Sequence, residues 1–130
     1  MLGVELFETE DGSVLVNELA PRPHNSGHFS IEACKTSQFE NHVRSILDWP
    51  LGDPSLRVPA AAMVNILGRR AGSVSSHSLS TLSEVNDVSI HIYGKAESRP
   101  DRKMGHVTVT ADNPDDALFR AEKAASKIVL

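Results

Sequence analysis

The chain has one cysteine, Cys34, among its 130 residues. A single cysteine excludes an internal disulfide bond and suits a reducing compartment. No stretch approaches the roughly 20 apolar residues of a membrane-spanning helix. The first residues enter an apolar segment directly, without a basic and apolar signal sequence. We therefore expect a cytoplasmic protein that is not inserted in a membrane.

The chain also lacks a strong excess of charge of either sign. Thirteen basic and seventeen acidic residues give a net charge of −4, which argues against bulk attraction to nucleic acid or to a membrane surface. There is no glycine-rich phosphate loop and no pair of lysines suited to a nucleotide lid. The length is sufficient to bury a core.

Two apolar segments near the N-terminus predict a β-hairpin. Asp11-Gly12 separates residues 3–9 from residues 13–19, and Asp-Gly between apolar runs is a strong hairpin signal. A two-residue turn places Phe7 opposite Val16 and Glu5 opposite Glu18. Because both faces are largely apolar, we expect the hairpin to be partly buried.

Opposed glutamates at a separation of about 4.5–5.5 Å between Cβ atoms repel each other. Such a pair shares either a proton or a cation. Oxygen ligands beside an anion-binding segment favour Mg²⁺ held jointly with phosphate oxygens. The alternative is that Glu5 and Glu18 are ordinary glutamates on the solvent faces of an edge hairpin.

The segment from Asn17 to His28 carries a carboxylate, a guanidinium, imidazoles, amides and a hydroxyl within twelve residues. Pro21 and Pro23 stiffen it, and Gly27 permits a turn. A solvated loop gains nothing from this arrangement, whereas a site that fixes a metal and an anionic substrate gains a great deal. The segment is therefore a candidate active site.

The remaining pattern predicts an α+β fold with antiparallel strands and a few packed helices. One helix starts at the capping box Ser37–Glu40 and stops before Trp49-Pro50. A second starts at Asn113-Pro114. Strands are expected at residues 58–67, 88–93 and 106–111, an exposed loop at 69–83, and packing of the last helix through Leu118, Ala121, Ala125 and Ile128.

The order of these motifs resembles that in the N5-carboxyaminoimidazole ribonucleotide synthases. These enzymes belong to the ATP-grasp superfamily and are the ATP-dependent part of phosphoribosylaminoimidazole carboxylase. The sequence looks most like the fungal or plant form, in which a carboxylase/mutase domain follows in the same polypeptide. The matching stretches span nearly the whole chain and are residues 3–7, 17–28, 36–40, 62–68 and 99–106.

The resemblance implies a ligase of purine biosynthesis. Such enzymes use ATP and Mg²⁺ to activate bicarbonate as carboxyphosphate and then carboxylate aminoimidazole ribonucleotide. Residues 1–50 would be the C-terminal piece of the ATP-grasp domain and residues 51–130 a small α+β C-terminal domain. The substrate-binding first domain and the ATP lid would lie upstream, so we expect the 130 residues to be inactive alone. The complete enzyme is expected to be a homo-oligomer.

The resemblance also implies residue roles. Glu5 and Glu18 would hold magnesium, and Asn17 and Glu18 would lie at the ATP site. Arg22, His24 and Lys103 would be catalytic. Arg22 offers a bidentate fork that lysine cannot, and His24 could orient bicarbonate or accept the amine proton. The residues expected to bind substrate are Asn25, Ser26, Arg99, Arg102 and Lys103.

Other interpretations remain open. His24 could be a structural histidine, and Arg99, Arg102 and Lys103 could form an ordinary solvated turn. Zinc at His24 and His28 is disfavoured, because no third nitrogen or sulfur ligand has a fitting spacing. The competing functions are formate-dependent glycinamide ribonucleotide formylation, by a related ATP-grasp enzyme, and a non-catalytic domain that only packs or dimerises.

Overall fold

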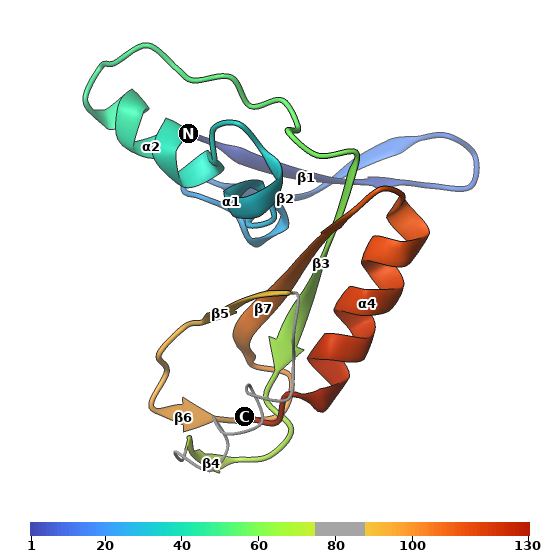
Figure 1. The fold of residues 1–130 in the computed structure, drawn as a ribbon. Coiled ribbons are helices and arrows are strands. Elements are labelled where there is room, and N and C mark those ends of the chain that lie inside the picture. The colour runs from blue at the N-terminus through green and yellow to red at the C-terminus, as the bar shows by residue number, and fades with distance from the viewer. Residues whose placement is uncertain (75–87) are drawn as a thin grey trace. The chain divides into compact units, whose positions relative to one another are not determined.

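The computed structural model describes residues 1–74 and 88–130. These residues form two compact units, Met1–Ser55 and Leu56–Leu130, and each is described by itself (Figure 1). Together they contain antiparallel strands and short to medium helices, so the predicted α+β class is confirmed. Within the described ranges, no helix combines the length and apolar content needed to cross a bilayer.

The N-terminal unit begins with the predicted hairpin. Strands β1 (Gly3–Glu8) and β2 (Val14–Ala20) pair antiparallel. The predicted two-residue turn is wrong, because residues 9–13 form a longer loop in which Thr9 N–H donates to Ser13 O at 2.9 Å. Phe7 consequently pairs with Leu15, not with Val16.

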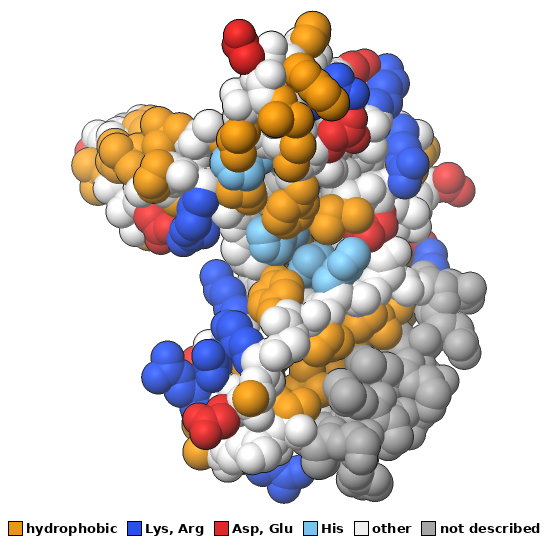
Figure 2. Space-filling model, turned by 90° about the vertical axis from the view of Figure 1, so that its left-hand side faces the viewer, with side chains coloured by type: hydrophobic (Ala, Val, Ile, Leu, Met, Phe, Trp, Pro, Cys, Tyr) orange, Lys and Arg blue, Asp and Glu red, His pale blue; other side chains and the backbone are white. Residues whose placement is uncertain are grey.

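The expectation of a partly buried hairpin is also wrong for its apolar side chains. They are between 50% and 65% exposed, because nothing in this unit covers them on either face of the two-stranded sheet. Figure 2 shows many hydrophobic side chains at the molecular surface. The exposed apolar residues of the hairpin are Val4, Leu6, Phe7, Val14, Leu15, Val16 and Leu19.

Three helical segments follow the hairpin. They are η1 (Asn25–Gly27), α1 (Ser30–Ala33) and α2 (Gln38–Ile46). The predicted cap of α2 is confirmed, since Ser37 Oγ accepts from Glu40 N–H at 3.1 Å. The helix ends with Asp48 in the left-handed region (φ 55°) and with Trp49 N–H donating to Arg44 O, the arrangement of a Schellman motif.

The second unit is built on a three-stranded antiparallel sheet with the order β3-β7-β5. Its strands are β3 (Ala60–Leu67), β5 (Ser89–Ile92) and β7 (Lys103–Ala111). All three predicted strands exist, although β7 begins three residues before its predicted start. Of the expected loop 69–83, residues 72–73 form β4 (Gly72–Ser73), which pairs with β6 (Glu97–Ser98). Residues 75–83 lie outside the described residues.

Helix α4 (Pro114–Lys127) packs along β3 and β7 (Figure 1). Asn113 caps it as predicted, accepting from Asp116 N–H at 2.9 Å. The predicted packing is confirmed for Ala121 and Ile128, which are in the core, and for Ala125, which packs against it. It is wrong for Leu118, which is 47% exposed, whereas Ala117 and Ala124 are buried. The core of this unit comprises Ile66, Met104, Val107, Val109, Ala121, Ala124, Ile128 and Leu130.

Candidate functional site

The side chain of His24 is the centre of the candidate site. Its Nε2 atom lies 3.8 Å from Glu5 Oε2 and 3.5 Å from Glu18 Oε1. The His24 side chain is only 14% exposed, whereas the two glutamates are 42% and 48% exposed. Two carboxylates from neighbouring strands therefore meet at one imidazole nitrogen, on the same side of the hairpin.

A β-bulge explains how the two glutamates come to lie opposite each other. Near the turn Leu6 pairs with Val16, but the next pair is Glu5 with Glu18, which leaves Asn17 as the extra residue. A bulge re-aims side chains on the bulged strand. Here the Asn17 amide donates a hydrogen bond to the Glu5 carboxylate. Asn17, Glu5 and Glu18 thus form one polar group.

The pairing of Glu5 with Glu18 was predicted, although the turn that led to it was not correct. The longer turn shifts the register by one residue, and the bulge at Asn17 shifts it back. Because a one-residue slip transfers every side chain to the other face, the bulge is the feature that keeps both carboxylates together.

Arg22 lies at the exposed edge of this group. Its Nη2 atom lies 3.6 Å from Glu18 Oε1, and its Nη1 donates to Pro23 O at 3.2 Å. The side chain is 63% exposed, so the guanidinium can also reach a ligand from solution. A bidentate carboxylate or phosphate contact fits its planar fork.

Asn25 and Ser26 follow His24 in the short helix η1. Ser26 N–H donates to His24 Nδ1 at 3.4 Å, and Ser26 Oγ lies 2.8 Å from the same nitrogen. A backbone N–H can only donate, so Nδ1 is an acceptor. The neutral imidazole therefore carries its proton on Nε2, directed toward the carboxylates.

The oxygen atoms of this site fit Mg²⁺ chemically. Glu5 and Glu18 supply two carboxylates, and Mg²⁺ is commonly bound by one or two carboxylates together with water and substrate phosphates. Among residues 1–74 and 88–130, no three His, Cys, Asp or Glu side chains form a metal-binding cluster. A magnesium ion at this site would take its other oxygen ligands from outside these side chains.

The predicted basic residues lie in the second unit, around the turn that leads into β7. Arg102 Nη1 donates to Glu97 O at 2.7 Å, and Lys95 Nζ donates to Lys103 O at 2.6 Å. Desolvation, followed by the positive charges of Arg102 and Arg99, lowers the pKa of Lys95. These residues therefore form a positively charged group, which we call the basic turn: Lys95, Arg99, Arg102 and Lys103.

The structure thus brings Glu5, Asn17, Glu18, Arg22, His24 and Ser26 together in the first unit. Asn25 lies between His24 and Ser26 in the chain, and Arg99, Arg102 and Lys103 lie in the second unit. Gln38, which contacts His24, was not predicted as part of the site. It lies fourteen residues away, on a helix, and no local pattern indicates that its side chain returns to the loop.

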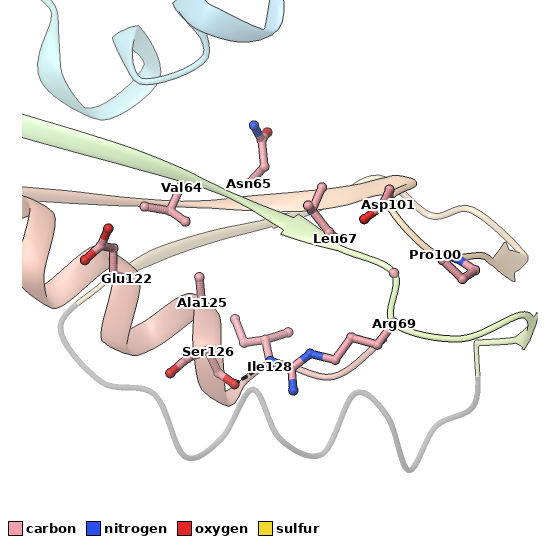
Figure 3. Close-up of a pocket in the computed structure, with 11 residues that line it drawn as sticks. Val64, Asn65, Leu67, Arg69, Pro100, Asp101, Glu122, Ala125, Ser126 and Ile128 are labelled. Atoms are coloured by element: carbon pink, nitrogen blue, oxygen red, sulfur yellow. Dashed lines mark hydrogen bonds between the residues drawn. The ribbon is translucent and has the colours of Figure 1, made fainter.

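A cavity of about 590 Å³ lies in the second unit, beside β3 and α4 (Figure 3). Arg69 Nη2 donates to Ser126 O at its edge, at a distance of 2.7 Å. Pro100 and Asp101 line this cavity, but Arg99, Arg102 and Lys103 do not. The cavity therefore borders the basic turn, but the predicted cationic residues do not line it.

Comparison with protein families gives two matches. Residues 1–39 match the ATP-grasp domain, and residues 61–120 match the phosphoribosylaminoimidazole carboxylase C-terminal domain. The chain is 49% identical over 128 residues to the N5-carboxyaminoimidazole ribonucleotide synthase of Mycobacterium tuberculosis, covering 96% of this chain but 30% of that protein.

Fungal proteins are similar as well. The phosphoribosylaminoimidazole carboxylase of Schizosaccharomyces pombe is 47% identical over 123 residues, covering 91% of this chain and 22% of that protein. These identities do not separate a fungal or plant form from a bacterial one.

A solved structure is similar too, that of N5-carboxyaminoimidazole synthase from Aspergillus clavatus in complex with ADP and 5-aminoimidazole ribonucleotide. The sequence identity is 39% and the TM-score is 0.81, and the match covers 98% of this chain and 34% of that one. The chain spans about 30% of the length of the curated relatives it matches.

Proposed function

We propose that this chain completes the active site of an N5-carboxyaminoimidazole ribonucleotide synthase, an ATP-grasp ligase of purine biosynthesis. The proposal is supported by the two family matches and by the similarity to the relatives named above. The proposed reaction is the ATP-dependent carboxylation of aminoimidazole ribonucleotide by bicarbonate. The observation that carries the proposal is the meeting of Glu5 and Glu18 at His24, beside Arg22.

Glu5 and Glu18 are the proposed magnesium ligands, with Asn17 beside them at the ATP site. Magnesium bound there would neutralise phosphoryl charge during transfer of phosphate from ATP to bicarbonate. Asn17 holds the Glu5 carboxylate through its amide, which supports its assignment to the same site. The contacts of Glu18 with both His24 and Arg22 link the proposed metal ligands to the proposed substrate loop.

Arg22 and His24 are proposed to orient the bicarbonate oxygens. Of the two roles implied for His24, its tautomer supports the orienting one, because Nδ1 accepts from Ser26 N–H and Nε2 carries the proton. Accepting the amine proton at Nε2 would require the other tautomer. Asn25 and Ser26 are proposed to contact the substrate at the same loop.

The basic turn is proposed to bind the substrate phosphate, with Lys103 also taking part in catalysis. Mutual repulsion among its cations contributes to the lowered pKa of Lys95, so an anion bound there would relieve unfavourable charge. Residues 1–50 would then serve as the metal, ATP and bicarbonate part, and residues 51–130 as the domain that supplies the cationic residues.

The rest of the enzyme is proposed to cover the hairpin. Seven large apolar side chains of β1 and β2 are at least half exposed in this unit. Burying such side chains would contribute about 25 cal/mol per Å² of apolar surface. We propose that upstream ATP-grasp elements pack on them, that the complete enzyme acts in the cytoplasm as a homo-oligomer, and that the 130 residues alone do not turn over ATP.

The decisive assay measures ADP release by the full-length natural polypeptide that contains this chain. ADP release should require aminoimidazole ribonucleotide and bicarbonate together. ADP release with glycinamide ribonucleotide and formate instead would favour the formylating alternative. Unchanged activity of both Arg22→Ala and Lys103→Ala would favour a non-catalytic packing domain. The relatives named above are carboxylating enzymes, which supports the first outcome.

A further inference from the structure

Gln38, the first residue of α2, holds the backbone of His24 through both ends of its side-chain amide. Its Oε1 accepts from His24 N–H at 3.1 Å, and its Nε2 donates to His24 O at 2.8 Å. The two contacts pair the amide with one residue of the loop, as a neighbouring strand would. Both are partly buried, where a lost hydrogen-bond partner is costly.

The same amide determines the tautomer of His28. Because His24 N–H can only donate, the amide atom facing it must be the oxygen. The other end is therefore the NH₂ group, which also lies 2.7 Å from His28 Nδ1. His28 Nδ1 must then accept, so neutral His28 carries its proton on Nε2. The His28 ring also packs against Phe39, with ring centroids 5.0 Å apart.

Close packing leaves little room for this arrangement to shift. A Cβ atom added at Gly27 would lie 2.6 Å from Gln38 Oε1, and one added at Gly3 would lie 2.8 Å from His24 Cβ. Ser30 Oγ accepts from Gln38 N–H at 2.9 Å and donates to Gly27 O. The loop is therefore held by the hairpin on one side and by α2 on the other.

We propose that Gln38 is a positioning residue that fixes His24, and with it the contact of Nε2 with Glu5 and Glu18, for the carboxylation proposed above. The inference rests on that proposed function. The side chain of Gln38 acts on the site through the backbone of His24, to which it donates and from which it accepts. A displacement of about 1 Å in such a site can reduce the rate about 100-fold.

The chain supplies a matched control on the same helix. Asn41 makes an equivalent clamp on Gly52, with Nδ2 donating to Gly52 O at 3.3 Å and Gly52 N–H donating to Oδ1 at 2.8 Å. Both amides are half-buried and both hold a distant backbone. Of the two, Gln38 is the one that holds a residue of the candidate site.

The experiment compares Gln38→Glu, Gln38→Met and Asn41→Asp in the longest polypeptide that contains these residues. Glutamate keeps the acceptor for His24 N–H but removes the donor to His24 O. We expect both Gln38 variants to lower kcat about 10- to 100-fold, with KM for ATP changed less than about two-fold. Asn41→Asp should lose about as much thermal stability as the Gln38 variants but retain a kcat near that of wild type.

A double-mutant cycle distinguishes a role of Gln38 in positioning His24 from a general contribution of Gln38 to the stability of the fold. If Gln38 acts through His24, the Gln38→Glu change should have little further effect on kcat in a His24→Ala background. The proposal would be overturned if the effects of the two substitutions on kcat were additive, or if the Gln38 and Asn41 variants lost kcat equally. It would also be overturned if both Gln38 variants unfolded while Asn41→Asp folded. Absence of wild-type carboxylation would instead refute the proposed function, so the two failures are distinguishable.

Discussion

Gly3 lies against the side chain of His24. A Cβ atom at Gly3 would stand 2.8 Å from His24 Cβ, closer than Cβ atoms approach other atoms in folded proteins, and 3.3 Å from His24 Cγ. The first residue of β1 therefore limits where the imidazole can lie. A site residue and a strand residue twenty-one positions apart are packed without a gap.

Replacing Gly3 by alanine should displace the imidazole. We expect Gly3→Ala to destabilise the N-terminal unit by about 1–3 kcal/mol, as other overpacking substitutions do, and to lower kcat of the complete enzyme at least about 10-fold. Gly12→Ala is the control, because a Cβ atom there would meet no atom of the described residues within 4 Å and its cost comes from a φ of +81°. Equal kcat values for the two variants would contradict the prediction.

The paired glutamates should determine the magnesium dependence. Glu5→Gln and Glu18→Gln each remove one negative charge while keeping the shape of the side chain. We expect each to raise the Mg²⁺ concentration at half-maximal activity and to lower kcat about 100-fold or more. Glu8→Gln, on the same strand but paired with Val14, should have neither effect. An unchanged Mg²⁺ titration in both site variants would count against magnesium binding here.

Arg22 should not tolerate lysine. Arg22→Lys keeps the charge but loses the planar fork, so KM for bicarbonate should rise or kcat should fall about 10-fold. Arg44→Lys is a matched control, because Arg44 also pairs with a glutamate four residues earlier, through Glu40 at 2.7 Å. The comparison of the two variants in a bicarbonate titration tests the prediction, and equal effects would reject it.

The pair of Lys35 and Asp53 should make the stability of the chain depend on pH at the acid end. Hydrogen bonds from Lys35 and Ser55 lower the pKa of Asp53 well below its usual range. A carboxylate with a lowered pKa in the folded state contributes stability above its unfolded pKa of about 3.9, and this contribution is lost as the pH falls further. The Lys35 Nζ to Asp53 Oδ2 distance is 2.9 Å.

Urea unfolding of wild type and Asp53→Asn at pH 7 and near pH 2 tests this prediction. Wild type should be the more stable protein at pH 7, and the difference should shrink at the acid pH. Lys35→Met should reduce the same pH dependence, since it removes the largest cause of the lowered pKa. A difference that stays constant between the two pH values would contradict the assignment.

Local signals predicted much of this protein. Ser37 and Asn113 cap helices as expected, because capping depends on side-chain oxygens within three residues. Strand positions followed from apolar runs. The prediction for Leu118 failed for a tertiary reason: the buried face of α4 is formed by Ala117, Ala121 and Ala124, and Leu118 lies outside that face.

The site was predicted only in part. The sequence indicated which side chains in residues 17–28 could form a site, because the residue types and stiffening prolines are local properties. It did not indicate the bulge at Asn17, which depends on how two strands pair. It gave no indication of Gln38 either, since a hydrogen bond across fourteen residues requires the path of the chain between them.

The amino-acid order by itself therefore determined the inventory of chemical groups, the helix caps and the family resemblance, all of which arise from neighbouring residues or from ancestry. Tertiary structure decided which groups meet. The compensating bulge places Glu5 opposite Glu18, and the hydrogen bonds of Gln38 fix the backbone of His24. These depend on contacts between residues that are distant in the chain, and such contacts form only when the elements pack.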